Sequence, residues 1–277
     1  MSTVIMVQGT SADAGKSILC TALCRLLAEE GWRVAPFCAQ TIGAETVDLP
    51  KGQISWSQYL QAEAAGVTPS VEMNPLLLAP LSEDSFQLTA QGVIKGELTR
   101  QELLAVSDTA LALVLDALQV LRSHYEVVII EGAATPVELH RPELMLPNMG
   151  LAKALDAPVL LVSDIDRGGM FAYVAGTLAL LPPEQRQLIQ AVVVNRFRGF
   201  RDKLQPGLEM LEEIIHKPVI GVIPHLNGLA LPPQAEAASA ATKEKREQSY
   251  QLLAQTLREN LDLSFIRKLL PAVRSKQ

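Results

Sequence analysis

Residues 7–27 read VQGTSADAGKSILCTALCRLL, and this segment is the strongest indication of fold in the chain. It sets Gly15-Lys16-Ser17 between a short apolar run and a helical pattern. A glycine turn that joins a strand to a helix N-terminus lets backbone N–H groups surround a phosphate, while the lysine neutralises charge and the hydroxyl reaches Mg²⁺. The helical pattern rests on apolar residues three and four positions apart: Leu19, Ala22, Leu23, Leu26 and Leu27. The stretch therefore predicts a phosphate-binding loop.

The spacing of this loop departs from the strict motif. Five residues separate Gly9 from Gly15 where the strict motif has four, so Thr10 takes the place of the first glycine. The strand before the loop and the helix after it still favour phosphate binding over a chance Gly-Lys-Ser on a surface turn. We expect the phosphates of a nucleotide to be held by the whole loop: Thr10, Ser11, Ala12, Asp13, Ala14, Gly15, Lys16 and Ser17.

Short β-branched runs alternate with longer helical segments along the rest of the chain. This alternation predicts an α/β fold, in which a mostly parallel sheet is covered by helices on both faces. Ligands of such sheets bind at the carboxyl ends of the strands. The expected strands are residues 3–8, 33–37, 126–132, 157–164, 190–195 and 218–224.

Polar residues close several of these runs. Glu131 could bind Mg²⁺ directly or through water, or could be a solvated strand end; the Gly132-Ala133-Ala134 that follows favours function. Asp164 and Asp166 carry the same two readings, and Arg167 is a candidate phosphate or carboxylate clamp. Asn195 could contact an adenine edge or serve as a cap or turn residue.

The chain divides into a main domain and a tail. We expect the main domain to span residues 1–231, with an insertion at about 38–98 that contains one clear helix over 56–65. Residues 232–248 have almost no large apolar side chains and predict a linker. Residues 249–277 return to helical periodicity and predict a C-terminal helical tail that docks on the body.

Composition sets the class of protein. A net charge of −6 and a pI near 5.3 argue against a nucleic-acid partner. Cys20, Cys24 and Cys38 are expected to be buried thiols, which suits a reducing compartment. The sequence shows no signal peptide and no run of eighteen apolar residues, so we expect a cytoplasmic protein without a membrane partner.

Six segments closely resemble the ATP-binding domain of the glutamine-hydrolysing cobyric acid synthase family, which has a dethiobiotin synthetase-like P-loop NTPase fold. The resemblance covers nearly all of residues 3–232, and the segments occur in the family's order. They are VQGTSADAGKS, LQAEAAGVTPSVEMNPLLL, VVIIEGAATPVE, NMGLAKALDAPVLLVSDIDRGGMFAYVAGTLALLP, VVVNRFRG and PVIGVIPHL.

The resemblance implies an ATP- and Mg²⁺-dependent reaction, in which corrinoid side-chain carboxylates are phosphorylated and ammonia then displaces the phosphate. It implies catalytic roles for Lys16, Glu131 and Asp164, and Mg²⁺ binding by Ser17 and Glu131. Asn195 and Arg196 would contact the nucleotide. The residues on the acceptor side would be Gln58, Gln61, Asp166 and Arg167.

Several positions depart from the family pattern. No cysteine follows Cys38, so we expect the family's Cys-His glutaminase domain to be lacking and ammonia to come from outside the chain. Cys38 and Ala79 stand where the family tends to have lysines, and Lys51-Gly52-Gln53-Ile54 replaces an acidic metal-binding segment. Asp48, or Glu45, could supply the missing metal ligand.

Three functions stay open on this basis. The first is a synthase-like amide ligase that acts on a corrinoid-like acceptor with ammonia from solution or from a separate glutaminase subunit. The second is a nucleotide-binding regulatory or partner protein derived from that synthase. The third is a ligase like dethiobiotin synthetase, which Cys38 in place of a lysine disfavours. A homodimer is compatible with each, although nothing in the sequence specifies one.

Overall fold

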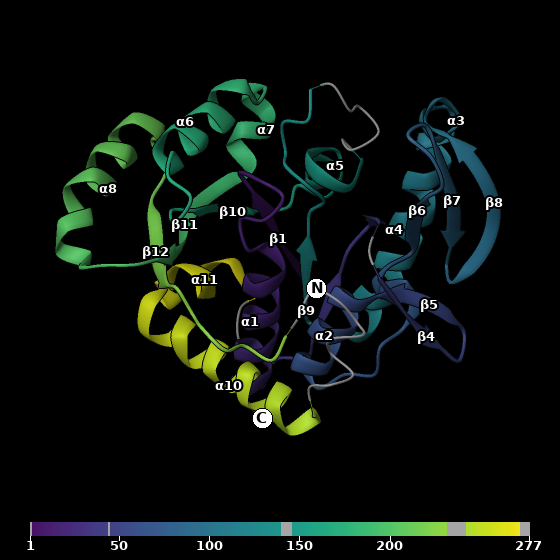
Figure 1. The fold of residues 1–277 in the computed structure, drawn as a ribbon, viewed down its shortest axis with the longest axis horizontal. Coiled ribbons are helices and arrows are strands. Elements are labelled where there is room, and N and C mark those ends of the chain that lie inside the picture. The colour runs from purple at the N-terminus through teal and green to yellow at the C-terminus, as the bar shows by residue number, and fades with distance from the viewer. Residues whose placement is uncertain (1, 44, 140–145, 232–241, 272–277) are drawn as a thin grey trace.

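Six parallel strands form the central sheet, in the order β12-β11-β10-β1-β9-β2 (Figure 1). The computed structural model describes residues 2–43, 45–139, 146–231 and 242–271. The strands are β1 (Thr3–Gly9), β2 (Val34–Phe37), β9 (Val127–Glu131), β10 (Val159–Asp164), β11 (Ile189–Phe197) and β12 (Val219–Pro224). They coincide with the six runs expected from the sequence, so the predicted parallel α/β sheet is confirmed.

Helices cover both faces of this sheet, because successive side chains of a strand point to opposite faces. Val4 and Met6 of β1 enter one apolar core, whereas Ile5 and Val7 enter the other. The first core is covered by α4 (Ser107–His124), α5 (Leu151–Leu155), α6 (Met170–Leu180), α7 (Pro183–Leu188) and α8 (Arg201–Ile215). The second is covered by α1 (Lys16–Glu29), α2 (Trp56–Ala65), α10 (Lys243–Asn260) and α11 (Leu263–Leu269).

The segment expected to be an insertion forms structure of its own beside the central sheet. Its sheet has the order β3-β6-β7-β8, and β4 and β5 form an antiparallel hairpin. Helix α2 begins where the Ser55 side chain accepts a hydrogen bond from the Gln58 N–H, and ends at left-handed Gly66. The remaining elements are β3 (Gln40–Ile42), β4 (Thr46–Leu49), β5 (Gly52–Ser55), β6 (Leu76–Pro80), β7 (Ser85–Ala90), β8 (Val93–Thr99), α3 (Arg100–Ala105) and two short turns, η1 (Val71–Met73) and η3 (Leu146–Gly150).

The C-terminal helices return to the body, as the periodicity predicts. Tyr250, Leu253, Ala254 and Leu257 of α10 pack into the core beneath α1. Residues 232–241 of the predicted linker, 232–248, lie outside the described residues. The linker prediction is wrong from position 243 onward, because α10 begins there. No helix in the described part of the chain is long and apolar enough to cross a membrane.

Candidate nucleotide site

The loop between β1 and α1 has the backbone of a phosphate cradle. Gly15 precedes the helix with φ 102°, a left-handed conformation that favours glycine, and a Cβ there would lie 2.0 Å from Asn195 Nδ2. Asn195 Nδ2 donates to the Ala14 carbonyl at 2.9 Å. Thr10 is fixed to β10 because its hydroxyl lies 2.7 Å from Ser163 Oγ. Both flanks of the loop are therefore tied to the sheet.

Lys16 spans the loop and reaches the segment that follows β9. Its Nζ donates to the carbonyls of Ser11 at 3.2 Å, Ala12 at 2.9 Å and Ala134 at 2.7 Å. These three bonds use every N–H of the ammonium group. The side chain is buried, and burial lowers its pKa although nearby Glu131 acts in the opposite direction. Phosphate oxygens would have to replace some of these carbonyls.

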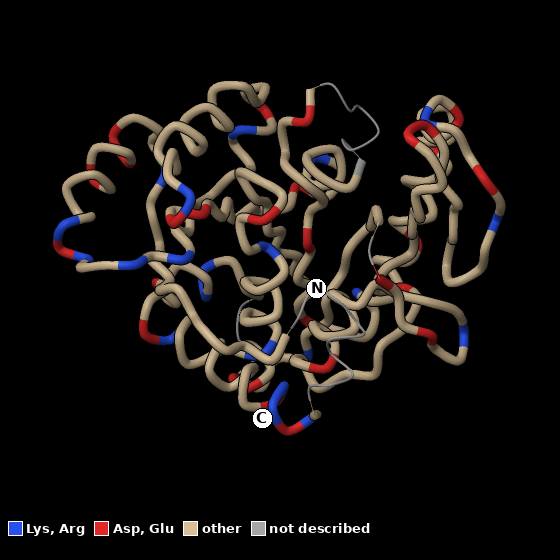
Figure 2. The backbone as a smooth tube through the Cα atoms, viewed as in Figure 1, with Lys and Arg blue, Asp and Glu red and all other residues tan. Residues whose placement is uncertain are grey.

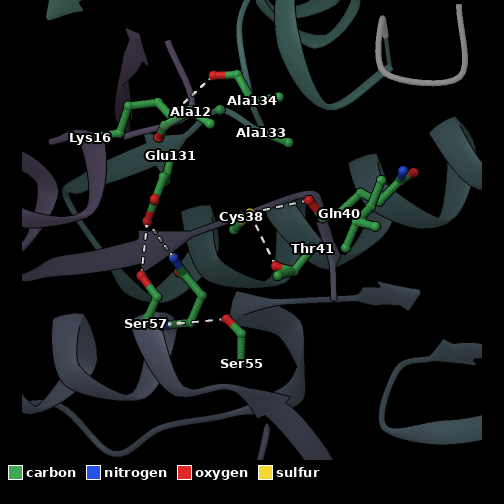
Figure 3. Close-up of a pocket in the computed structure, with 13 residues that line it drawn as sticks. Ala12, Lys16, Cys38, Gln40, Thr41, Ser55, Ser57, Glu131, Ala133 and Ala134 are labelled. Carbon is green, nitrogen blue, oxygen red and sulfur yellow. Dashed lines mark hydrogen bonds between the residues drawn. The ribbon is translucent and has the colours of Figure 1, made fainter. Parts of the chain in front are cut away.

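Glu131, at the tip of β9, accepts hydrogen bonds only from uncharged donors among the described residues. Figure 3 shows one of these bonds, from Ser57. Ser17 Oγ donates to its Oε1 at 2.5 Å, whereas its Oε2 accepts from Ser57 Oγ at 3.2 Å, Gln58 Nε2 at 3.3 Å and Gln61 Nε2 at 2.5 Å. The side chain is buried. These bonds fix its orientation without cancelling its charge.

This arrangement fits a magnesium ion. Mg²⁺ prefers hard oxygen ligands and is usually bound by one or two protein groups together with water and substrate phosphates. The Ser17 hydroxyl and Glu131 Oε1 are such a pair, because they face each other at the first turn of α1. Glu131 Oε2 is already occupied by three donors, so Oε1 is the oxygen suited to a metal. Residues Ser17 and Glu131 would hold the ion.

Asp164, at the tip of β10, has the opposite kind of environment. Arg196 Nη1 lies 2.7 Å and Arg167 Nε 3.6 Å from its Oδ2. Arg167 also pairs with Asp13 of the loop at 3.1 Å. Asp166 N–H donates to Asp164 Oδ1 at 2.8 Å. Figure 2 shows acidic and basic residues side by side at the ends of β10 and β11. Arg196 has φ 58°, a sparsely populated conformation for a residue other than glycine.

Two cavities flank Lys16 and share Ala12, Lys16 and Ser57. The first, of about 330 Å³, lies on the Glu131 side; Figure 3 shows Cys38, Thr41 and Ser55 around it. Its full lining is Ala12, Lys16, Cys38, Gln40, Thr41, Ile42, Ser55, Ser57, Gln58, Glu131, Gly132, Ala133 and Ala134. The second, of about 490 Å³, follows the loop to α1. It is lined by Ala12, Asp13, Gly15, Lys16, Ser17, Ile18, Thr21, Trp56, Ser57, Leu60, Arg167, Arg196 and Leu231.

The structure changes the place of several predicted residues. Asn195 supports the loop through Ala14 and lines neither of these cavities. Gln61 is buried behind Glu131, and of the predicted pair Gln58 alone lines the first cavity. Asp166 pairs with Arg198 at 3.0 Å, away from both linings.

Two further sequence expectations fall away from the loop. Asp48 is not brought to Glu131: it lies on the β4–β5 hairpin, accepts from Gln53 Nε2 at 2.7 Å and lines neither cavity. Asp48 therefore does not take the place of the missing metal ligand, because the hairpin holds its carboxylate at an exposed surface. Ala79 is also exposed, on β6, and lines neither cavity.

Sequence reasoning missed Ser57 and the carbonyl of Ala134. Ser57 donates to Glu131 and accepts from Gln61 Nε2 at 3.1 Å. Its position four residues before Gln61 on one helix was the available signal. No side-chain pattern could have marked Ala134, because it acts through its carbonyl, held at φ 48°. Gly132 was singled out, and a Cβ there would lie 2.4 Å from Gln8 Oε1.

The fold and this loop define a nucleotide-binding protein of the phosphate-loop class. Residues 5–237 match the family model described as CbiA, the CobQ/CobB/MinD/ParA nucleotide binding domain. The match covers most of the chain, and the chain belongs to this family.

Curated relatives are named for one activity. The chain is 45% identical over 241 residues to the probable cobyric acid synthase of Methanothermobacter thermautotrophicus, covering 86% of this chain and 48% of the relative. It is 45% identical over 234 residues to the cobyric acid synthase of Pelotomaculum thermopropionicum, covering 84% and 45%. For the enzyme of Mycolicibacterium paratuberculosis the values are 46% over 232 residues, 83% and 47%. The chain thus spans about half the length of these relatives.

Solved structures share the fold at low identity. The signal recognition particle receptor FtsY of Elizabethkingia anophelis superposes with a TM-score of 0.51 at 16% identity, over 90% of this chain and 65% of that one. A MinC:MinD cell division protein complex of Aquifex aeolicus gives 0.50 at 14% identity, over 100% and 99%. These values show a common fold alone.

Proposed function

We propose that the chain is an ATP- and Mg²⁺-dependent, cobyric acid synthase-like protein. It would amidate corrinoid-type carboxylates through an acyl phosphate, with ammonia supplied from outside the chain, either from solution or from a separate glutaminase subunit. The observation that carries this proposal is the pairing of Ser17 with Glu131 beside Lys16, between two cavities. One cavity suits the nucleotide and the other the acceptor.

In this proposal the chain positions two anions and neutralises their charge. The loop N–H groups, Lys16 and the Arg196 guanidinium would bind the phosphates in the larger cavity. Bound Mg²⁺ would supply charge neutralisation between the phosphates and the acceptor. Ser17 and Glu131 would hold the ion, and the acceptor carboxylate would approach through the smaller cavity. Lys16, which lines both cavities, would be the cation common to both reactants.

A second candidate keeps the nucleotide site without amidation. Lys16 is the only cation among the described residues that line the smaller cavity, and its N–H groups are all engaged. Cys38 in that lining is a neutral thiol, because burial raises its pKa to about 12. An acceptor carboxylate would find little positive charge there before Mg²⁺ binds. This lining favours a regulatory or partner protein, or an altered acceptor.

Several finer points of function remain predictions from the sequence. A dethiobiotin synthetase-like subclass within the phosphate-loop fold is a proposal drawn from the sequence motifs, as is a ligase activity of that type. A cytoplasmic location, a homodimer and a corrinoid-like acceptor also stay predictions.

Phosphate release distinguishes these candidates. Purified chain is incubated with Mg·ATP, with and without a corrinoid carboxylic acid and ammonium chloride, and inorganic phosphate is followed over time. Release that requires both additions would support the synthase-like function, and a Lys16→Ala variant controls for contaminating phosphatases. ATP binding by calorimetry with no stimulated release would instead support the regulatory candidate. Release stimulated by the ammonium salt alone would contradict a corrinoid acceptor.

A further inference from the structure

The C-terminal helix α10 contacts α2 through a partly buried ionic cluster. Arg246 donates from Nε to Glu63 Oε2 at 2.7 Å and from Nη2 to Glu63 Oε1 at 2.8 Å. Tyr250 Oη donates to Glu63 Oε2 at 2.8 Å. The Arg246 and Glu63 side chains are 13% and 16% exposed, and Tyr250 is buried. A forked, charge-assisted contact of this kind fixes orientation as well as distance.

The ionisation of this cluster agrees with its geometry. Burial alone would raise the pKa of Glu63, but the hydrogen bonds from Arg246 and Tyr250 bring it below its ordinary value. Burial and the bond to Glu63 raise the pKa of Tyr250. The carboxylate therefore stays charged and the phenol stays protonated at neutral pH, so all three hydrogen bonds persist.

Helix α2 connects this cluster to the candidate metal site. It has ten residues, and it presents Ser57, Gln58 and Gln61 to Glu131 while Glu63 turns to α10. Positions 61 and 63 are about 200° apart around a helix, so the two contacts hold nearly opposite faces. A rotation of α2 would move the donors away from Glu131. The contact at Glu63 resists such a rotation.

Helix α10 also contacts α1, which carries Ser17, the remaining hydrogen-bond donor to Glu131. Arg25 of α1 donates to Glu247 from both terminal nitrogens, at 3.2 and 2.5 Å, and Arg258 of α10 donates to Glu29 at 2.5 Å. Helix α10 thus spans α1, which carries Ser17, and α2, which carries the three other donors. Glu63 lies more than 180 positions before Arg246 and Tyr250 in the sequence.

We propose that Arg246 and Tyr250 are positioning residues for the nucleotide site: by holding Glu63 they set α2 against Glu131, so that Mg²⁺-dependent ATP binding requires a docked α10. This inference rests on the proposed role of Glu131 in binding Mg²⁺. Neither residue touches the loop or lines the two cavities, so each acts through α2. The expected role resembles that of outer-shell partners that orient a metal ligand.

The test measures how much Mg²⁺ strengthens ATP binding in the full chain. Calorimetric dissociation constants for ATP are obtained with excess MgCl₂ and with EDTA, and their ratio is compared between variants. Arg246→Met removes the forked contact and keeps an aliphatic stem. We expect it to reduce the ratio about tenfold, while the constant in EDTA stays within about twofold. Arg246→Lys should restore part of the ratio.

A matched control breaks an ion pair on the same C-terminal segment that does not involve α2. Arg267 of α11 pairs with Glu30 at 2.7 Å, and Arg267→Met should leave the ratio unchanged. Circular dichroism verifies that each variant is folded. If Arg246→Met does not fold, Tyr250→Phe serves in its place, because it removes one hydroxyl from the cluster and keeps the buried ring. We expect this variant to reduce the affinity ratio as well, but by less than Arg246→Met.

Two results would overturn the inference alone: an unchanged ratio in folded Arg246→Met and Tyr250→Phe, or an equal loss of affinity with and without Mg²⁺. A different result would overturn the proposed function together with it. If the unmodified chain binds ATP equally well in MgCl₂ and EDTA, Glu131 does not hold the ion, and α10 has no metal ligand to position.

Discussion

Glu131 and Asp164 end the two strands that flank β1, yet their surroundings differ in charge. Both carboxylates are buried. Glu131 is held by hydroxyl and amide groups, whereas Asp164 is held by Arg196 and Arg167. Arginines compensate a buried negative charge, and uncharged donors leave most of it in place. The comparison shows that strand-end carboxylates in one sheet can serve different purposes.

This difference suggests that the Glu131 side of the phosphate loop binds a cation and that the Asp164 side binds phosphate. Lys16 lies near Glu131, but every hydrogen bond that Glu131 accepts among the described residues comes from an uncharged donor. Such a carboxylate suits a divalent cation, for which Ser17 supplies a second oxygen. Asp164 already has its counterions, and it orients Arg196 and Arg167 at the wall of the larger cavity. Guanidinium groups there suit phosphate oxygens.

Lys16→Ala should have the largest effect, because Lys16 serves both sides. We expect ATP affinity to fall about 100-fold, equivalent to about 2.8 kcal/mol. Isothermal titration with Mg·ATP measures it. Lys153→Ala is the matched control, since Lys153 is an exposed lysine of α5 whose ion pair with Glu184 is 3.7 Å long. Unchanged affinity in Lys16→Ala would show that the loop does not cradle phosphates.

Arg196→Ala should weaken ATP binding about tenfold, with and without Mg²⁺ alike. The loss should shrink as salt is raised, because it removes an electrostatic contact at a partly exposed position. Arg198→Ala provides the comparison: Arg198 also pairs with an aspartate, Asp166, but lines neither cavity. Equal losses in the two variants would argue against a specific phosphate contact from Arg196.

Asn195→Ala separates a loop support from an adenine contact. The bond from Asn195 Nδ2 to the Ala14 carbonyl predicts that affinity falls about fivefold for ATP and GTP alike. Competition binding with both nucleotides measures the ratio of their affinities. A selective loss of ATP binding would support the adenine contact expected from the sequence and contradict the supporting role.

Cys38→Ser should have the smallest effect. Within the described part of the chain, the Cys38 thiol makes two weak sulfur contacts, 3.5 Å to the Gln40 carbonyl and 3.5 Å to Thr41 Oγ1, so ATP affinity should change less than about twofold. Burial raises its pKa to about 12, so the thiol stays protonated and adds no pH dependence between about pH 7 and 9. ATP affinity is measured at both pH values for Cys38→Ser and for the unmodified chain. If the affinity of the unmodified chain changed with pH and that of Cys38→Ser did not, the thiolate would have a role.

The sequence was sufficient for the central sheet because its strands are short apolar runs, buried on both faces. The same runs end in Glu131 and Asp164, so the edge of the sheet that carries the site was also predictable. The rule that parallel sheets bind ligands at their carboxyl ends supplied that step.

The roles of the individual side chains were not predictable, because they depend on packing between distant segments. Gln61 reaches Glu131 from a helix 70 positions away, and Asn195 reaches Ala14 from 181 positions away. No local pattern encodes either contact. Asp48 shows the converse, since a carboxylate at a plausible position in the sequence lies on a hairpin away from the loop.

The most direct test of the division between the two carboxylates is the dependence of ATP affinity on Mg²⁺ in Glu131→Gln and Asp164→Asn. Each substitution keeps the shape of the side chain and removes its charge. We predict that Glu131→Gln abolishes the gain in affinity that Mg²⁺ gives, whereas Asp164→Asn keeps that gain and weakens binding equally in MgCl₂ and EDTA. If Asp164→Asn abolished the gain and Glu131→Gln kept it, the assignment of the metal to Glu131 would be contradicted.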